Sequence, residues 1–65
     1  MKKRFLIIVA NGQVVEQDNI QIALNPNLRG VSDADQARVV EFLQNARPGV
    51  KIEVGEVVIV RLSNE

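Results

Sequence analysis

The sequence predicts one small α+β domain, in which a mostly antiparallel sheet of four or five strands carries a single helix on one face. Three observations favour this fold. Short apolar segments with the period of strands occupy both halves of the chain, and turn residues separate them. The middle of the chain has the spacing of one amphipathic helix. The chain has 65 residues, which suits a single domain covering residues 1–65.

The first predicted element is a hairpin. Residues 4–10 read RFLIIVA and carry apolar side chains at both odd and even positions, that is, at both parities. Odd and even positions of a strand face opposite sides of a sheet, so we expect a strand that is covered on both faces. Asn11-Gly12 follows, and both residue types tolerate the positive φ angles of a tight type I′ turn. Residues 13–17 then return as the second strand.

The next segment, residues 20–24, is predicted to be extended. It reads IQIAL, an alternation of apolar with polar or small side chains that is typical of a half-buried strand. It is either a third strand, reached by a turn at residues 18–19, or the far part of a long second strand that carries a bulge. The sequence NPN at residues 25–27 ends it, because proline lacks a backbone donor and asparagine favours turns.

The helix is predicted over residues 33–46. Ser32 precedes it as the N-cap, and Asp33 and Asp35 place negative charge at the positive end of the helix dipole. Pro48-Gly49 ends it. The apolar residues of this helix share one face: Val39, Val40, Phe42, Leu43 and Ala46.

The C-terminal part of the chain predicts a second pair of strands. Residues 50–54 alternate as a half-buried strand, whereas residues 57–60 are apolar at both parities and predict a central strand. Gly55-Glu56 between them is either a type II′ hairpin turn or a bulge within one long strand. Residues 61–65 form a polar exit.

This order, hairpin–helix–hairpin, resembles the β-grasp arrangement of ubiquitin-like and sulfur-carrier proteins. The resemblance concerns the architecture. Sulfur carriers end in a Gly-Gly tail that takes part in their chemistry, whereas this chain ends in RLSNE at residues 61–65. The resemblance therefore does not imply a sulfur-carrier function.

The most apolar strands also predict a second contact surface. Side chains of opposite parity within residues 5–9, and again within residues 57–60, cannot all point at one helix. Another surface must cover the second face of the sheet, and a second copy of the chain is the simplest candidate. We therefore expect a homodimer.

The residue inventory argues against catalysis and against metal binding. The chain has no His, no Cys and no Tyr, which excludes nucleophiles activated by histidine. Ser32 fits a helix cap, and Asp33 and Asp35 stand two apart on a helix, where they do not face each other. We expect no catalytic residue, no metal site, no cofactor and no small-molecule substrate.

Charge and hydropathy limit the cellular partners. Eight Lys and Arg balance eight Asp and Glu, so neither a strongly basic nucleic-acid binder nor an acidic nucleic-acid mimic is indicated. No apolar run approaches the ~18–20 residues of a membrane span, and residues 5–10 are too short for a signal peptide. We expect a cytoplasmic protein without membrane contact. Small stand-alone chains of this kind are frequent among bacterial and phage proteins.

Two functions remain as hypotheses. The first is a non-catalytic protein-binding module, acting as a small regulator, inhibitor or assembly subunit. Its contacts would come from the long loop at residues 25–31, because long loops on small domains are often functional. The candidate contact residues are Asn25, Asn27, Leu28 and Arg29. Leu28 has an alternative place in the core.

The second hypothesis is a nucleic-acid-associated protein that uses its basic N-terminus. Lys2, Lys3 and Arg4 would contact phosphates. Proteins that bind single strands commonly stack bases on aromatic rings, but Phe5 and Phe42 fit the core better.

Overall fold

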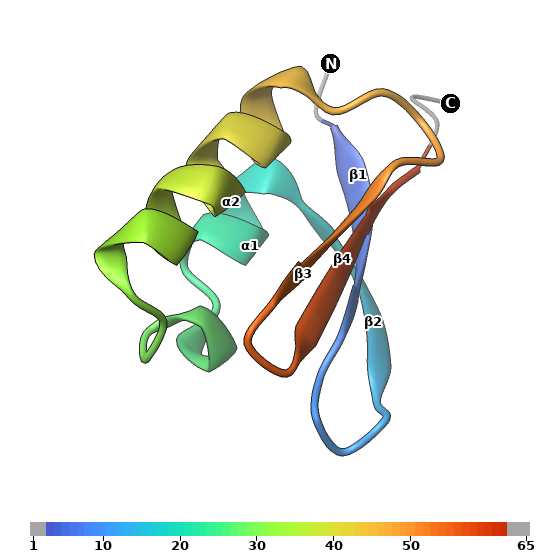
Figure 1. Ribbon diagram of the computed structural model, residues 1–65. Helices are drawn as coiled ribbons and strands as arrows, with labels where there is room; N and C mark the ends of the chain where they lie inside the picture. Colours follow the sequence, from blue (N-terminus) through green and yellow to red (C-terminus); the bar gives the residue numbers. More distant parts are fainter. Residues whose placement is uncertain (1–2, 63–65) are drawn as a thin grey trace.

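The computed structural model describes residues 3–62 as two layers, a four-stranded sheet and two helices (Figure 1). The elements are β1 (Arg4–Ile8), β2 (Val14–Asp18), α1 (Asn19–Ala23), the short 3-10 helix η1 (Pro26–Leu28), α2 (Asp33–Asn45), β3 (Lys51–Val54) and β4 (Val57–Arg61). All neighbouring strands are antiparallel, in the order β2-β1-β4-β3. The α+β class and the predicted order of two strands, a main helix and two strands are confirmed.

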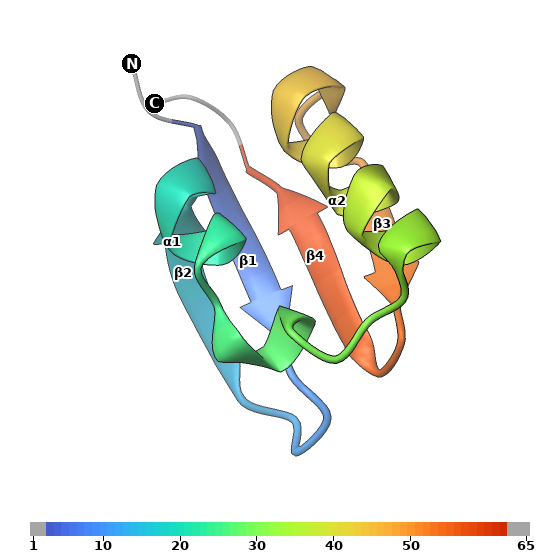
Figure 2. The same cartoon turned by 90° about the vertical axis from the view of Figure 1, so that its left-hand side faces the viewer.

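The two strands that are apolar at both parities occupy the centre of the sheet. β1 and β4 pair with each other, with Ile7 opposite Ile59, and each has a further strand on its other side. Both helices lie on one face, α1 against β1 and β2, and α2 against β3 and β4 (Figure 2). The helix-facing side chains of the central strands, including Phe5, Ile7 and Ile59, are fully buried. The core therefore lies between the sheet and the helices.

The first hairpin is confirmed, but its predicted type I′ turn is wrong. Gly12 has a φ of +88°, whereas Asn11 has a negative φ, as do all described residues other than glycine. The Gly12 amide donates to the Val9 carbonyl (2.9 Å), and the Val9 amide donates to the Gln13 carbonyl (3.0 Å). The Asn11 side chain accepts from the Gln13 amide (2.9 Å), which favours a three-residue loop with glycine in its left-handed position.

The second hairpin resolves the choice left open at Gly55-Glu56. Val54 pairs directly with Val57, so two residues connect β3 to β4 and no bulged single strand is present. Gly55 has a φ of +59° and Glu56 does not have a positive φ. This pattern suits a type II′ turn, which requires glycine at its first central position.

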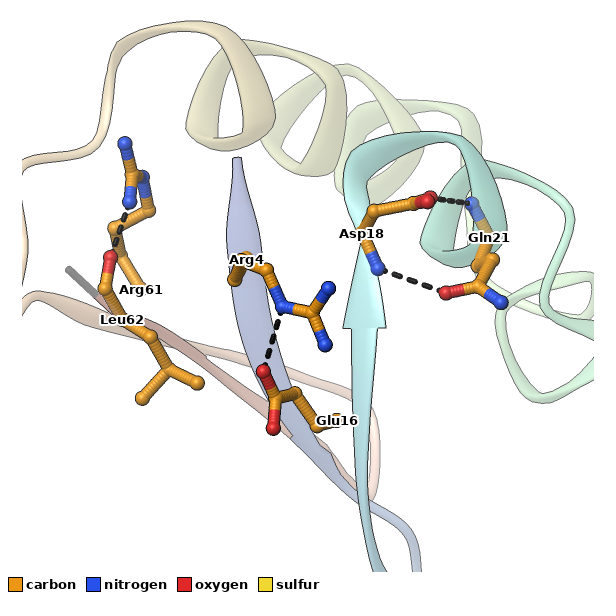
Figure 3. Close-up of polar contacts among 6 residues, drawn as sticks. All are labelled: Arg4, Glu16, Asp18, Gln21, Arg61 and Leu62. Carbon is orange, nitrogen blue, oxygen red and sulfur yellow. Dashed lines mark hydrogen bonds and ion pairs between the residues drawn. The ribbon is translucent and has the colours of Figure 1, made fainter. Parts of the chain in front are cut away.

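The extended segment predicted at residues 20–24 is wrong, both as a third strand and as the far part of the second strand, because β2 ends at Asp18 and residues 19–23 form the helix α1. Asp18 is the N-cap, and its side chain accepts from the Gln21 amide (2.8 Å). The Gln21 side chain in turn accepts from the Asp18 amide (2.9 Å), so the two residues form a capping box (Figure 3). The helix buries Ile22 completely and turns Ile20 and Leu24 outward. The capping box and the burial of Ile22 therefore determine the helical conformation of this segment, although its alternating apolar pattern is typical of a strand.

The main helix matches its prediction at both ends but not over its whole apolar face. The Ser32 hydroxyl accepts from the Asp35 amide (3.2 Å), which confirms the cap, and α2 ends at Asn45, one residue earlier than predicted. Phe42 packs against the ring of Phe5, with ring centroids 5.9 Å apart. Val40, predicted to lie in the core, is instead exposed. The predicted apolar arc is wider than the strip of helix that the sheet can cover.

The predicted polar exit begins one residue too early. Arg61 is the last residue of β4, pairs with Phe5 across the sheet and is buried. Its guanidinium lies 5.5 Å from the centroid of the Phe5 ring, and its Nη1 donates to the Leu62 carbonyl (Figure 3). A cation over an aromatic face is a favourable arrangement, which helps a charged residue to occupy this position. Residues 63–65 lie outside the described residues.

Candidate functional site

A solvent-open apolar groove runs between α1 and α2 on the outer side of the helical layer. One part has a volume of about 350 Å³ and reaches the loop after α1. The other part continues along the two helices toward the start of β1. Both parts share the lining residues Ala23, Leu24, Val40 and Leu43. We call this surface, together with Ile20, the α1–α2 groove.

The groove concentrates large apolar side chains that the fold leaves exposed. Leu24 is 71% exposed, and Ile20 and Val40 are each 55% exposed. Their exposure follows from local structure. α1 has five residues, so only one of its large apolar side chains reaches the sheet, and Leu24 follows as its C-cap. Isolated apolar residues are common on protein surfaces, but several gathered in one groove mark an interaction site.

The charged groups at the groove are both cations. Lys3 lies in the part near β1, and Arg29 lies in the part near the loop. No Asp or Glu is present among the described residues that line it. The Lys3 ammonium also donates to the Leu43 carbonyl (3.3 Å) and to the Gln44 carbonyl, at the negative end of α2. The groove is therefore apolar along its length and positive near both ends.

The four loop residues predicted to contact a partner have two different structural roles. Asn25 is buried, accepts from the Asn27 amide (2.8 Å) and donates to the Gln17 side chain (3.0 Å). Leu28 is buried in the core, which was its alternative place. Asn27 and Arg29 are exposed, and Arg29 lines the groove. The predicted loop thus forms one end of the groove rather than a separate site.

The basic N-terminal residues are engaged with the fold wherever they are described. Lys2 lies outside the described residues. The Lys3 ammonium donates hydrogen bonds to carbonyls at the C-terminal end of α2. The Arg4 Nε lies 2.6 Å from the Glu16 carboxylate on the neighbouring strand (Figure 3). The Glu16 carboxylate offsets the charge of Arg4 that a phosphate backbone would otherwise meet, whereas the carbonyls bonded to Lys3 leave its positive charge in place.

The residues that sequence reasoning missed are Ile20, Leu24 and Val40. A signal for the first two was present, since Asp18 followed three residues later by Gln21 is a capping-box pattern that predicts a helix start. A helix over this segment places Ile20 and Leu24 on one side, four residues apart. No comparable signal separated Val40 from the buried side chains of its helix.

Across residues 3–62, no three His, Cys, Asp or Glu side chains gather closely enough to hold a metal ion. Within the same residues, neither helix has the length and apolar character that crossing a membrane requires. No family model, curated protein or solved structure matches the chain. The groove is therefore interpreted from its own chemistry.

Proposed function

We propose that this protein is a non-catalytic binding module that holds an apolar segment of another protein in the α1–α2 groove. The observation that carries the proposal is the cluster of Leu24, Ile20 and Val40, each more than half exposed, between two helices. Burying such side chains against a partner is the main source of affinity in helix-in-groove recognition. The protein would act as a small regulator, inhibitor or assembly subunit.

The chemistry of the groove favours an amphipathic helix with acidic residues at its ends. α2 has 13 residues and spans about 20 Å, so a partner helix of ~10–15 residues could lie along it. Its apolar side chains would meet Leu24 and Val40. Acidic side chains near its ends would meet Lys3 and Arg29, since no acidic side chain among the described lining residues opposes them.

The size of the expected effect follows from the exposed area. Burying a Leu or Val side chain completely contributes about 1.5–3 kcal/mol, and these side chains are already partly covered. Each should therefore contribute on the order of 1 kcal/mol to binding, and a charge placed at the same position should cost more. A double substitution to aspartate should weaken binding by at least about 100-fold, since 1.4 kcal/mol is a factor of ten.

The test is a comparative pull-down from nuclease-treated host lysate. The wild-type protein is compared with a Leu24→Asp, Val40→Asp double variant and with Val50→Asp. Val50 is a matched control, because it is an apolar residue, 47% exposed, that lies outside the groove. Far-UV circular dichroism confirms that every variant is folded.

We expect one stoichiometric protein that the wild type and Val50→Asp capture and that the double variant does not. The same capture by all three proteins would contradict the groove as the binding site. A synthetic peptide from the captured protein should then bind the wild type, as measured by isothermal titration calorimetry. The apolar face of that peptide should be essential for its binding.

Nucleic-acid association through Lys2, Lys3 and Arg4 stays a prediction, with less support than the groove. The same experiment tests it when nuclease is omitted. Recovery of nucleic acid by the wild type, and its loss in a Lys3→Glu, Arg4→Glu variant, would favour that alternative.

A further inference from the structure

The edge strand β3 directs part of its backbone away from the sheet. Among the described residues, only β4 pairs with it, and α2 is the helix that lies beside it (Figure 2). In an antiparallel strand, successive residues point their amide and carbonyl groups to opposite sides. The Arg61 amide donates to the Val50 carbonyl (2.9 Å), so alternate residues from Val50 to Val54 face β4. The backbone groups of Lys51 and Glu53 therefore point outward, where a further strand would bond to them.

One of these outward groups has a weak contact within the chain. The Arg38 guanidinium donates to the Glu53 carbonyl over 3.4 Å, and its other terminal nitrogen donates to Asp35 on the same helix (3.1 Å). A separation of 3.4 Å lies beyond the usual range for this kind of hydrogen bond. An incoming backbone amide would replace it, and Arg38 would keep its partner on α2. Addition of a strand to such an edge is a common mode of protein recognition.

The side chains of β3 divide into a charged face and an apolar face. Lys51 and Glu53 are exposed on the face opposite the helices, and neither forms an ion pair with another described residue. Val54 and Ile52 face the helices. Val54 is fully buried, whereas Ile52 is half-buried and lines a hollow of about 360 Å³ between β3 and α2. A strand that pairs with β3 must therefore match two opposite charges on one face and an apolar side chain on the other.

The β3 strand of a second copy meets these requirements. When two β3 strands run antiparallel about a two-fold axis at Ile52, Lys51 of each copy stands opposite Glu53 of the other. These are the residues whose backbone groups point outward, so both pairs are hydrogen-bonded pairs. Ile52 meets Ile52 of the other copy on the helical face. Opposite charges and apolar side chains placed directly across from each other stabilise paired strands.

The neighbouring registers lack this complementarity. Registers that keep the outward backbone groups opposite each other, and that lie next to this one, place the axis on Lys51 or on Glu53. Each brings two like charges directly opposite each other, which is destabilising. The other edge strand, β2, is also less suited. Glu16 already contacts Arg4, the Asp18 amide is taken by the capping box, and an axis at Glu16 would pair two glutamates.

We propose that two copies of the chain form a dimer by antiparallel pairing of their β3 strands, which joins the two sheets into one. The two-fold axis is perpendicular to this sheet, so both helical layers lie on the same side of it. Helices pack 8–10 Å apart, about the width of two strands, so one helix for every two strands lets the two α2 helices lie side by side. Their facing sides carry Arg38 and Glu41, one charge of each sign. The α1–α2 groove lies on the other side of α2 and is complete within each copy.

The first test uses the charge reversals Lys51→Glu and Glu53→Lys, with sedimentation velocity at low salt. The paired segments are short, so we expect a weak dimer with a dissociation constant of about 10 µM to 1 mM. Each reversal alone places like charges opposite each other at two positions, so self-association should weaken by at least about tenfold. The control Glu16→Lys makes the same charge change as Glu53→Lys on the other edge strand and should leave the dimer intact.

Two combinations of the reversals should restore the dimer. The double variant Lys51→Glu, Glu53→Lys exchanges the two charges, so it should dimerise like the wild type. An equimolar mixture of the two single variants also places opposite charges together at both positions, so it should contain a heterodimer. High salt should weaken the wild-type dimer, because exposed charge pairs are screened.

The second test is amide hydrogen exchange followed by nuclear magnetic resonance at low and high protein concentration. The amides of Lys51 and Glu53 lie outside the ladder between β3 and β4, so they should exchange about threefold more slowly, or less, once most of the protein is dimeric. The amides of Ile52 and Val54 face β4 in both states and serve as internal controls.

Circular dichroism checks that each variant is folded, and both reversed positions are exposed. A wild-type protein that stays monomeric up to 1 mM would overturn the proposal. So would single reversals that dimerise like the wild type, a folded double variant that does not dimerise, or a dimer in which the amides of Lys51 and Glu53 are not slowed. Self-association that is lost in Leu24→Asp but kept in both reversals would assign the contact to the α1–α2 groove and refute the β3 interface.

Discussion

The assignment of residues 19–23 to a helix rather than a strand can be tested with three alanine substitutions, Ile20→Ala, Ile22→Ala and Leu24→Ala. In a strand these three residues would share one face, so their substitutions would have similar effects. In the helix only Ile22 faces the sheet, where it is fully buried. Ile20 and Leu24 point into the α1–α2 groove.

The expected magnitudes separate the two arrangements. Truncation of a buried isoleucine to alanine costs about 2–5 kcal/mol, because it removes apolar contacts and leaves a cavity. A domain of this length has a total stability of only about 3–10 kcal/mol. Ile22→Ala should therefore remove a large fraction of the stability. The other two substitutions should each change the free energy of unfolding by less than about 1 kcal/mol.

The assay is urea unfolding followed by far-UV circular dichroism, since the chain has no Trp or Tyr for intrinsic fluorescence. With an m value near 1 kcal/mol/M, the midpoint for Ile22→Ala should fall by about 2 M or more. If that variant does not fold, Ile22→Val provides the comparison, at an expected cost of about 0.5–1.5 kcal/mol. Similar losses at all three positions would refute the helical assignment.

Three further pairs of substitutions, each a test with its control, examine local features by the same unfolding measurement. Lys3→Met removes the hydrogen bonds to the last carbonyls of α2 and should lower the free energy of unfolding by about 1 kcal/mol. The control Arg29→Met changes an exposed residue and should lower it by less than about 0.5 kcal/mol. Equal losses for both variants would argue against a role of Lys3 at the end of the helix. Gly12→Ala places a side chain at a φ of +88° and should cost about 1–2 kcal/mol. Gly30→Ala, with open space around the new Cβ and no positive φ, should be neutral or slightly stabilising, and a loss as large as that of Gly12→Ala would contradict this reasoning. Ser32→Ala should cost about 1 kcal/mol and Ser32→Gly only a few tenths, and the reverse order would count against side-chain capping of α2.

Most of the fold could be predicted from the sequence, because its strongest patterns are local. The cap at Ser32 and the stop at Pro48-Gly49 define the main helix within one residue. Strands that are apolar at both parities, such as residues 57–60, predicted the centre of the sheet. Gly12 and Gly55 marked both hairpins, since each provides a backbone conformation that other residues rarely adopt.

The tertiary structure decided what the periodicities could not. The alternation at residues 20–24 suits a strand, but the capping box and the burial of Ile22 select a helix, so α1 covers one face of the sheet where a third strand or a longer second strand was expected. The apolar arc of α2 did not show that Val40 lies beyond the reach of the sheet. The sequence pattern predicts which apolar side chains share one face of a helix or strand. Which of them are buried depends on how many other side chains pack against them in the folded chain. The α1–α2 groove contains such side chains, which are apolar but remain exposed because the sheet does not cover them.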